Sequence, residues 1–292
     1  MCIRDSLSTF AFGGLLYGFS SASTLGWGNA VVVDSIVVGV VALAWFIHRQ
    51  LHIEEPLLQL RALKTPTFAY SAVIVTVVNS ALAVGSVILP IYLQNVLGLT
   101  AFETGILMTP GAVATIFLSP VSGMLFDRFG PRVIAIVGLT GLTASLAALS
   151  FVDDKTMVAY LVAFYVIQSS GLTLANMPVT TWGINALPND MIAHGNAISN
   201  TGRQVGGAVS TALIVTVMTM VTAANAEAGP VLSTAAGIDV AYGISAAVAG
   251  IALVIAVLKV RNVKKQAVAS PASQAEAPLE IEMEEAREGA AR

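Results

Sequence analysis

The sequence predicts an all-α polytopic membrane protein, and three observations carry that prediction. Of its 292 residues, 56% are hydrophobic and 11% are charged, and the mean hydropathy is +0.81. The apolar residues form uninterrupted runs, and residues 65–102 contain no Asp, Glu, Lys, Arg or His. These runs lack the polar face that recurs every 3.6 residues in helices of soluble proteins. Each is long enough to cross a bilayer as a helix.

The runs predict eight membrane spans. Glycines in the first span favour close helix packing, and Trp27 and Trp45 bracket the second as interfacial anchors. Thr100 and Glu103 have the spacing of a capping box, so a helix should begin there. Pro110 and Pro120 should bend the fourth span. The spans are expected at about 7–21, 30–47, 68–93, 102–121, 133–151, 158–179, 197–221 and 241–257.

Composition divides the chain into five parts. Residues 1–6 are interpreted as a non-native start, because they are polar and lead directly into an apolar run. Residues 7–47 hold two leading spans, and residues 48–67 form a charged connector with a partly apolar face, expected to lie on the cytoplasmic membrane surface. Residues 68–261 hold six spans. Residues 262–292, rich in Ala, Glu, Pro and Ser, are predicted to be a disordered tail.

The stretch 123–132 reads G-M-L-F-D-R-F-G-P-R between two apolar runs. Its Arg128 and Arg132 indicate the cytoplasmic side, because short loops rich in Lys and Arg stay inside. Alternation of the spans then places both chain ends in the cytoplasm, with Lys155 the only basic residue of the outer loops. The inner regions hold Arg49, Arg61, Lys64, Arg128, Arg132, Lys259, Arg261, Lys264 and Lys265.

The pattern G-x-x-x-D-R-x-G-P-R resembles the loop signature of the major facilitator superfamily. Two leading spans, a basic connector and six spans with this signature after the second are similar to the C-terminal part of the fourteen-helix drug:proton antiporter branch. Residues 89–98, 105–111 and 199–208 also resemble that branch. The resemblance implies a six-helix bundle preceded by two linker helices. It also implies an N-terminal truncation, with the proton-carrying acids in the missing N-terminal half.

The resemblance implies proton-coupled efflux of drugs or other amphiphilic small molecules by alternating access. The expected partners are the lipid bilayer, a small-molecule substrate, protons and the missing half, and the expected location is a bacterial inner membrane. Two alternatives stay open: a facilitator-type transporter of another solute, since fold does not decide substrate, and a non-transporting half-length membrane module.

Several functions are not expected. No Ser-His-Asp set or phosphate loop points to an enzyme or a cofactor, and the basic residues follow the loops, which argues against a nucleic-acid partner. His48 and His52 are four residues apart, but an obvious third metal ligand is missing, so a juxtamembrane flank is the simpler interpretation. Cys2 is the single cysteine. No metal site is predicted.

The motif supplies the first candidate site: Gly123, Asp127, Arg128, Gly130 and Arg132. These residues could form only a turn with a stop-transfer charge, for which Gly-Pro is suitable. The resemblance instead implies a gating loop, in which Asp127 caps a helix end of the opposite half and holds one face of the transporter shut.

A second candidate set lies in the seventh span. Arg203 is expected about 10 Å inside the membrane, where it either snorkels back to the surface or faces the seam between two bundles together with Gln204. Gly202, Gly206 and Gly207 favour the seam, because they let another backbone come close.

The remaining polar residues at membrane depth are Asn79, Gln168, Asn176 and Asn200. Such groups need partners, either between packed helices or in a water-filled cavity. Asn79 and Gln168 are the first candidates to line a cavity, since the resemblance places their helices along the pathway. Asp34 is interpreted as a solvated acid near the interface, with a proton or cation role as the alternative.

Overall fold

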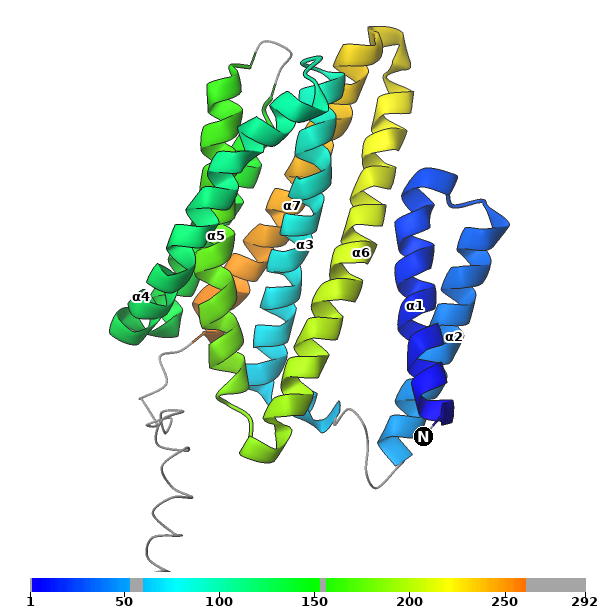
Figure 1. The fold of residues 1–292 in the computed structure, drawn as a ribbon, viewed down its shortest axis with the longest axis vertical. Helices are drawn as coiled ribbons and strands as arrows, with labels where there is room; N and C mark the ends of the chain where they lie inside the picture. The colour runs from blue at the N-terminus through cyan, green and yellow to red at the C-terminus, as the bar shows by residue number, and fades with distance from the viewer. Residues whose placement is uncertain (1, 53–59, 153–155, 261–292) are drawn as a thin grey trace, which may run out of the picture. The chain divides into compact units, whose positions relative to one another are not determined.

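In the computed structural model, the described residues are 2–52, 60–152 and 156–260, and they form seven α-helices and three short 3₁₀-helices (Figure 1). The expected non-native start at 1–6 is partly described, since Cys2 already begins the first helix. The expected tail at 262–292 lies outside the described residues. The long helices are α1 (Cys2–Leu25), α2 (Ala30–His52), α3 (Pro66–Asn95), α4 (Ala101–Leu149), α5 (Val158–Ile184), α6 (Ile192–Ala224) and α7 (Pro230–Lys259).

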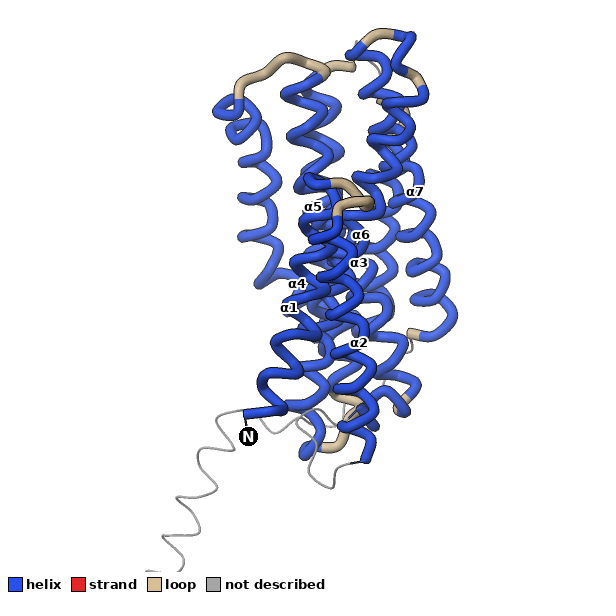
Figure 2. Tube along the Cα trace, turned by 90° about the vertical axis from the view of Figure 1, so that its right-hand side faces the viewer, coloured by secondary structure: helices blue, strands red, loops and turns tan. Residues whose placement is uncertain are grey.

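Helix α4 is a hairpin of two arms. Its 49 residues would extend about 74 Å as one rod, more than twice the hydrocarbon thickness. Gly130 interrupts it with φ 79° and ψ 169°, a backbone conformation open to glycine. Pro131 then opens the second arm, a position that proline favours. Figures 1 and 2 show the chain doubling back here, so the two arms correspond to the predicted fourth and fifth spans.

Membrane-spanning length is confirmed for much of the chain. Among the described residues, α3, α4, α5, α6 with its preceding 3₁₀-turn, and α7 are each long and apolar enough to cross a bilayer. The apolar part of α2, Ala30–Trp45, is shorter, and α1 is not in this set. With the reversal in α4, the fold is the all-α, polytopic arrangement that the sequence predicts.

The helices extend beyond the predicted spans, because a helix does not end where hydrocarbon ends. The expected polar hinge at 180–196 is largely helical, divided between α5, a 3₁₀-turn at Asn189–Met191 and α6. The last helix begins at Pro230, 11 residues before the predicted start at Ala241. Its start is set by Gly229, at φ 95°, followed by proline. The capping box of Thr100 and Glu103 is confirmed.

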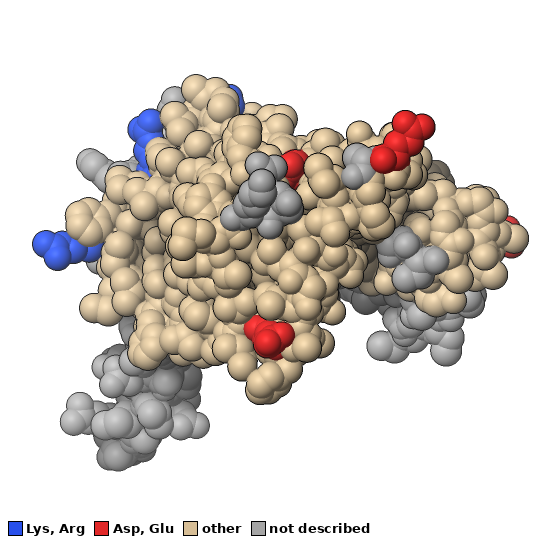
Figure 3. All heavy atoms as spheres, turned by 90° about the horizontal axis from the view of Figure 1, so that it is seen from above, with Lys and Arg blue, Asp and Glu red and all other residues tan. Residues whose placement is uncertain are grey.

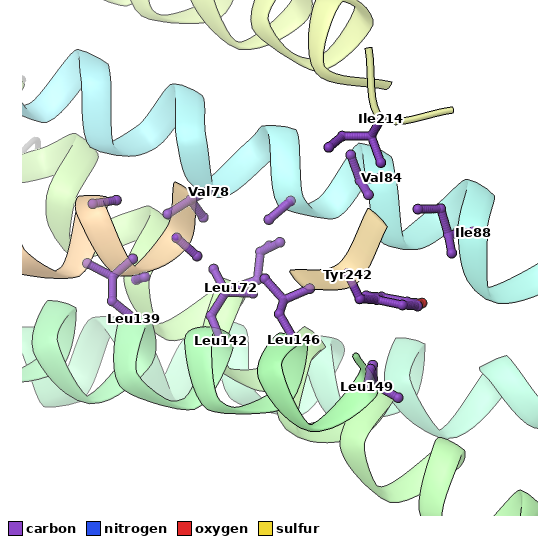
Figure 4. Packing of buried hydrophobic residues seen from close by; sticks show 14 of the residues in the cluster. Val78, Val84, Ile88, Leu139, Leu142, Leu146, Leu149, Leu172, Ile214 and Tyr242 are labelled. Carbon is purple, nitrogen blue, oxygen red and sulfur yellow. The ribbon is translucent and has the colours of Figure 1, made fainter. Parts of the chain in front are cut away.

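The main apolar core lies between α3, the second arm of α4, α5 and α7 (Figure 4). Leu139, Leu142, Leu146 and Leu149 recur at three- and four-residue intervals, so they share one face of the second arm. That face is fully buried. Its neighbours in the cluster include Val78, Val84 and Ile88 of α3, Leu172 of α5, Ile214 of α6 and Tyr242 of α7.

Two glycines bring the backbones of α4 and α5 together. A Cβ atom added to Gly138 would lie 2.6 Å from the Ala175 nitrogen and 2.7 Å from the Gly171 oxygen. A Cβ added to Gly171 would lie 2.6 Å from the Gly138 oxygen. Side chains cannot be accommodated at such separations, so this interface depends on the absence of Cβ atoms at both positions.

Helices α1 and α2 form a second hairpin, which packs against α6. Gly14 and Gly39 face each other within the hairpin, where an added Cβ on Gly14 would lie 3.1 Å from the Gly39 Cα. Trp27, in the turn, donates its indole N–H to the Thr216 hydroxyl of α6. Ala22, Val32 and Ala212 are buried at this contact. The two predicted linker helices are therefore joined to the six-span bundle by a hydrogen bond and an apolar cluster.

The turns alternate between the two ends of the helices (Figures 1 and 2). Residues 26–29, 96–100 and 225–229 lie at one end, while residues 60–65, Gly130 and residues 185–191 lie at the other. Figure 3 views the first end, where acidic side chains are visible and basic ones appear only at the margin. The described basic residues of the second end are Arg61, Lys64, Arg128, Arg132 and Lys259.

We predict that Gly138→Ala destabilises the protein, because the new methyl group would collide with the α5 backbone rather than with a movable side chain. The expected loss is about 2 kcal/mol, as for other overpacked interiors. Thermal unfolding of the purified protein in detergent measures it. Gly105→Ala is the matched control, since an added Cβ there meets nothing within 4 Å. Equal melting temperatures for the two variants would contradict the proposed backbone contact.

Candidate functional site

The predicted gating loop is mostly helix. Residues 123–129 complete the first arm of α4, and Gly130 alone leaves the helical conformation before Pro131 starts the second arm. The prediction of a ten-residue loop was therefore wrong in extent, because Gly-Pro reverses the chain in one step. Gly123 packs beside α5, where an added Cβ would lie 3.6 Å from the Met177 methyl carbon. Charged residues of the motif thus sit on rigid helix ends.

Arg132 fastens this turn to the last helix. Its Nη2 donates a hydrogen bond of 3.2 Å to the carbonyl oxygen of Val257 in α7. Carbonyls in the last turn of a helix lack intrahelical donors and carry partial negative charge, so a guanidinium stabilises them. The neighbouring Lys259 places its Nζ 5.3 Å from the ring centroid of Tyr70 in α3. Together these contacts hold the basic ends of α3, α4 and α7 in place.

Asp127 and Arg128 are exposed beside this contact. The Arg128 guanidinium carbon lies 5.4 Å from the centroid of the adjacent Phe129 ring. Asp127 makes no hydrogen bond or ion pair with other described residues, and it lies at the carbonyl end of the first arm, where a carboxylate is electrostatically unfavourable. The motif thus contains an internally bound arginine and an exposed acid. The gating role of these residues stays a prediction.

The glycines of α6 have a partner within the chain. An added Cβ on Gly202 would lie 3.2 Å from the Thr76 hydroxyl, and one on Gly206 would collide with the Thr76 methyl at 2.3 Å. Gly207 is buried, and its Cβ would lie 3.6 Å from that of Ala83. All three contacts are with α3. We expected these glycines to serve a seam between two bundles, but here they allow α3 and α6 to approach each other.

Arg203 lies 11 residues into α6, deeper than predicted, because the helix begins at Ile192 rather than near Ala197. The Arg203 side chain is half-buried and donates a hydrogen bond from Nη2 to the Oδ1 of Asn200. Asn200 and Gln204 are exposed. A contact of Arg203 and Gln204 with another bundle remains a prediction.

The four neutral polar candidates have different environments. Asn79 donates to the Val75 carbonyl of its own helix at 2.8 Å, and Asn176 accepts a 3.4 Å hydrogen bond from Thr180. Gln168 is only 3% exposed, and its Oε1 has no hydrogen-bond partner among the described residues. Its Nε2 would lie 2.6 Å from a Cβ added to Gly85 in α3. Asn200 lies elsewhere, on α6, so these residues do not form one site, and their cavity role stays a prediction.

Sequence reasoning missed Asp239, which it assigned to a loop. In the structure Asp239 is half-buried within α7, and its Oδ1 accepts a 3.3 Å hydrogen bond from the backbone N–H of Val152. The Gly229-Pro230 pair was the signal that could have revealed the longer helix. Asp34 is exposed, and the described residues contain no cluster of three His, Cys, Asp or Glu side chains suited to a metal.

The Major Facilitator Superfamily matches residues 6–211, which is more than half of the chain. The chain belongs to this superfamily. Superfamily members are transporters rather than enzymes. The match includes the hairpin motif of α4 and the glycine-rich part of α6, so the sequence-based identification is confirmed, and the described helices are those of a multi-pass membrane protein.

Individual relatives resemble much of the chain. An uncharacterized MFS-type transporter, YcnB of Bacillus subtilis, is 45% identical over 212 residues, covering 73% of this chain and 45% of the relative. A lincomycin resistance protein, LmrB of Listeria monocytogenes, is 39% identical over 73% of this chain and 45% of its own length. A multidrug resistance protein B homolog of Mycobacterium tuberculosis is 26% identical over 75% and 40%, respectively. The chain therefore spans about half the length of these relatives.

We predict that Arg132→Ala lowers stability by about 1 kcal/mol, because it removes a charged donor from a carbonyl at the end of α7. Arg128→Ala is the control, since it removes the same charge four residues earlier, where the described contact is with the neighbouring Phe129. Thermal unfolding in detergent distinguishes them. If both variants melt at the wild-type temperature, the bond to Val257 does not stabilise the fold.

Proposed function

We propose that this chain is the C-terminal bundle of a secondary transporter that exports drugs or other amphiphilic small molecules by proton-coupled alternating access. The observation that carries the proposal is the exposed Asp127 beside the α4 reversal of a superfamily member whose relatives are named as resistance proteins. Transport would require a second bundle, and the length of the relatives supports one.

The substrate class rests on the relatives' names. Besides the lincomycin and multidrug resistance proteins, a tetracenomycin C resistance and export protein of Streptomyces glaucescens is 26% identical over 68% of the chain. Fold alone does not choose a substrate, so the proposal is limited to the shared property of these compounds, which is moderate size with both apolar and polar surface.

Alternating access needs a contact between bundles that can form and break. Asp127 is suited to that contact, because its carboxylate is exposed and at the unfavourable end of its own helix. In one state of the cycle it would approach the N-terminal end of a helix in the other bundle, where a carboxylate is stabilised by roughly 0.3 to 1 kcal/mol. An interaction of this size closes the gate and still allows it to reopen.

The charge distribution supports a cytoplasmic location for the α4 reversal. Arg61, Lys64, Arg128, Arg132 and Lys259 share one end of the helices, and Lys and Arg accumulate in cytoplasmic loops. Both ends of this chain would then face the cytoplasm of a bacterial cell.

Proton coupling is assigned to the other bundle. The acidic residues of α3 to α7 are Glu103, Asp127 and Asp239. Glu103 caps a helix, Asp127 lies at a helix end, and Asp239 binds a backbone N–H. A carboxylate that carries protons needs an environment in which its charge can appear and disappear, so the coupling acids are expected among the helices that precede this chain in the relatives.

Expression of the natural full-length protein in an efflux-deficient bacterial host tests the function. We expect higher resistance to lincomycin, lower accumulation of ethidium, and loss of both effects when a protonophore collapses the proton gradient. A transporter of another solute would change neither drug. If the full-length protein reaches the membrane and moves no compound of a broad amphiphilic panel, the export proposal fails, and a non-transporting membrane module is favoured.

We predict that Asp127→Asn in that protein lowers the initial rate of efflux about tenfold while leaving membrane abundance within twofold, because only the charge of an exposed carboxylate is removed. Efflux per molecule, from fluorescent substrate release normalised by immunoblot, is the measurement. Asp190→Asn, an exposed acid at the same end of the helices, serves as the control. Parallel losses of rate and abundance would show that Asp127 is structural.

A further inference from the structure

One face of α6 changes its surroundings along its length. Asn200, Arg203 and Gln204 are spaced three and four residues apart and therefore share a face. Seven-residue steps extend this face to Gly207, Ile214 and Met218, which are buried. Near Asn200 and Gln204 the face is exposed. Its neighbours therefore cover the upper half but not the lower half.

The cause of this change is the course of α7. At the upper end, Gly237 of α7 lies against α6, where an added Cβ would be 2.6 Å from the Met218 carbonyl oxygen. At the lower end, the Val257 carbonyl of α7 binds Arg132 of α4 instead. Figure 1 shows α7 beginning beside α6 and ending beside α4 and α5. The polar face of α6 is thus exposed where α7 has diverged.

The exposed face has an uncompensated positive charge. Neither α6 nor α3, which packs along it, contains an Asp or Glu residue. The acids nearest to Arg203 along the chain are Asp190, 13 residues earlier, and Glu227, 24 residues later. A guanidinium in a membrane helix is almost always paired or directed to the headgroups, so an anionic partner is expected for Arg203.

The hydrogen bond of Arg203 shows in which direction the side chain extends. Asn200 lies one turn nearer to the start of α6, so the guanidinium is directed toward the basic end of the helices. Because the Asn200 Oδ1 accepts this bond, its amide Nδ2 is left as a donor. The remaining guanidinium N–H groups and the Gln204 amide add further donors. This surface therefore suits an acceptor with several oxygen atoms.

The depth of Arg203 agrees with a lipid phosphate. The 33 residues of α6 extend about 50 Å, roughly 20 Å more than the hydrocarbon core. With the helix centred, the first ~10 Å lies among the headgroups, and Arg203, ~16 Å from the start, lies ~6 Å below them. An extended arginine side chain covers that distance. Its guanidinium would therefore lie at the level of the phosphates of the leaflet on this side.

We propose that Arg203, Asn200 and Gln204 bind the phosphodiester of a membrane phospholipid on the face of α6 that α7 leaves exposed. The guanidinium supplies the charge, and the two amides supply additional hydrogen bonds to the phosphate oxygens. The acyl chains lie along the apolar surface beside them, where Val73 of α3 is 50% exposed. The site does not depend on the transport function.

Native mass spectrometry of the full chain in detergent, titrated with phosphatidylglycerol, tests the site. Arg203→Gln is expected to weaken binding of the first lipid about tenfold, because it removes a charge-assisted interaction. Arg61→Gln is the matched control, since Arg61 is an exposed cation at the same end. It should change binding less than about twofold, as expected for a screened surface charge. Equal weakening by the two variants would mean non-specific attraction and overturn the proposal.

Asn200→Asp provides an independent variant in case Arg203→Gln fails to fold. It keeps the arginine but places a carboxylate beside it, so the lipid phosphate must compete with an internal anion. Weakening of about tenfold is expected again. Unchanged lipid affinity in this variant would overturn the proposal. Displacement of the lipid by millimolar inorganic phosphate would also overturn it, by identifying a site for free anions.

Discussion

The close contact between the second arm of α4 and α5 is the constraint on which the bundle depends. In lipid, burying an apolar side chain between helices gains little over leaving it among acyl chains, so helices associate through shape and close approach. Gly138 and Gly171 place two backbones in direct contact. The leucines of the second arm then lie at the right height to meet α3 and α7. With α4 folded back at Gly130, this contact also determines where the first arm must run.

The basic end of the helices separates a structural function from an exposed charge. Arg132 and Lys259 interact with neighbouring helices of the same bundle, whereas Asp127 is exposed. A gate that opens needs both properties, because a mobile contact transmits force only when it is mounted on a rigid support. The capped end of α7 provides that support. The proposed lipid site on α6 lies at the same end and adds an interaction between this support and the membrane.

Much of the fold was predictable from the sequence, because a bilayer leaves a chain few options. Long apolar runs must satisfy their backbone hydrogen bonds internally and therefore form helices, and Thr100 and Glu103 fix one helix start in three residues. The motif at 123–132 identified the superfamily. Helix ends in water were less predictable: α7 begins at Pro230 because a Gly-Pro pair starts a helix irrespective of hydropathy. The partners of individual polar groups were not predictable either. Gly206 meets Thr76, and Trp27 meets Thr216, through register between helices that no local pattern encodes.

The one-residue reversal at Gly130 has a consequence for biosynthesis. The two arms of α4 have no loop between them that could wait in water while the first arm enters the lipid. A single arm inserted alone would pull Arg128 and Arg132 toward the hydrocarbon before the second arm had left the ribosome. The arms must therefore enter the bilayer as a preformed helical pair. Synthesis of this region then proceeds in steps of two crossings, and the positive charges at the tip keep that tip on the side from which the ribosome delivers it.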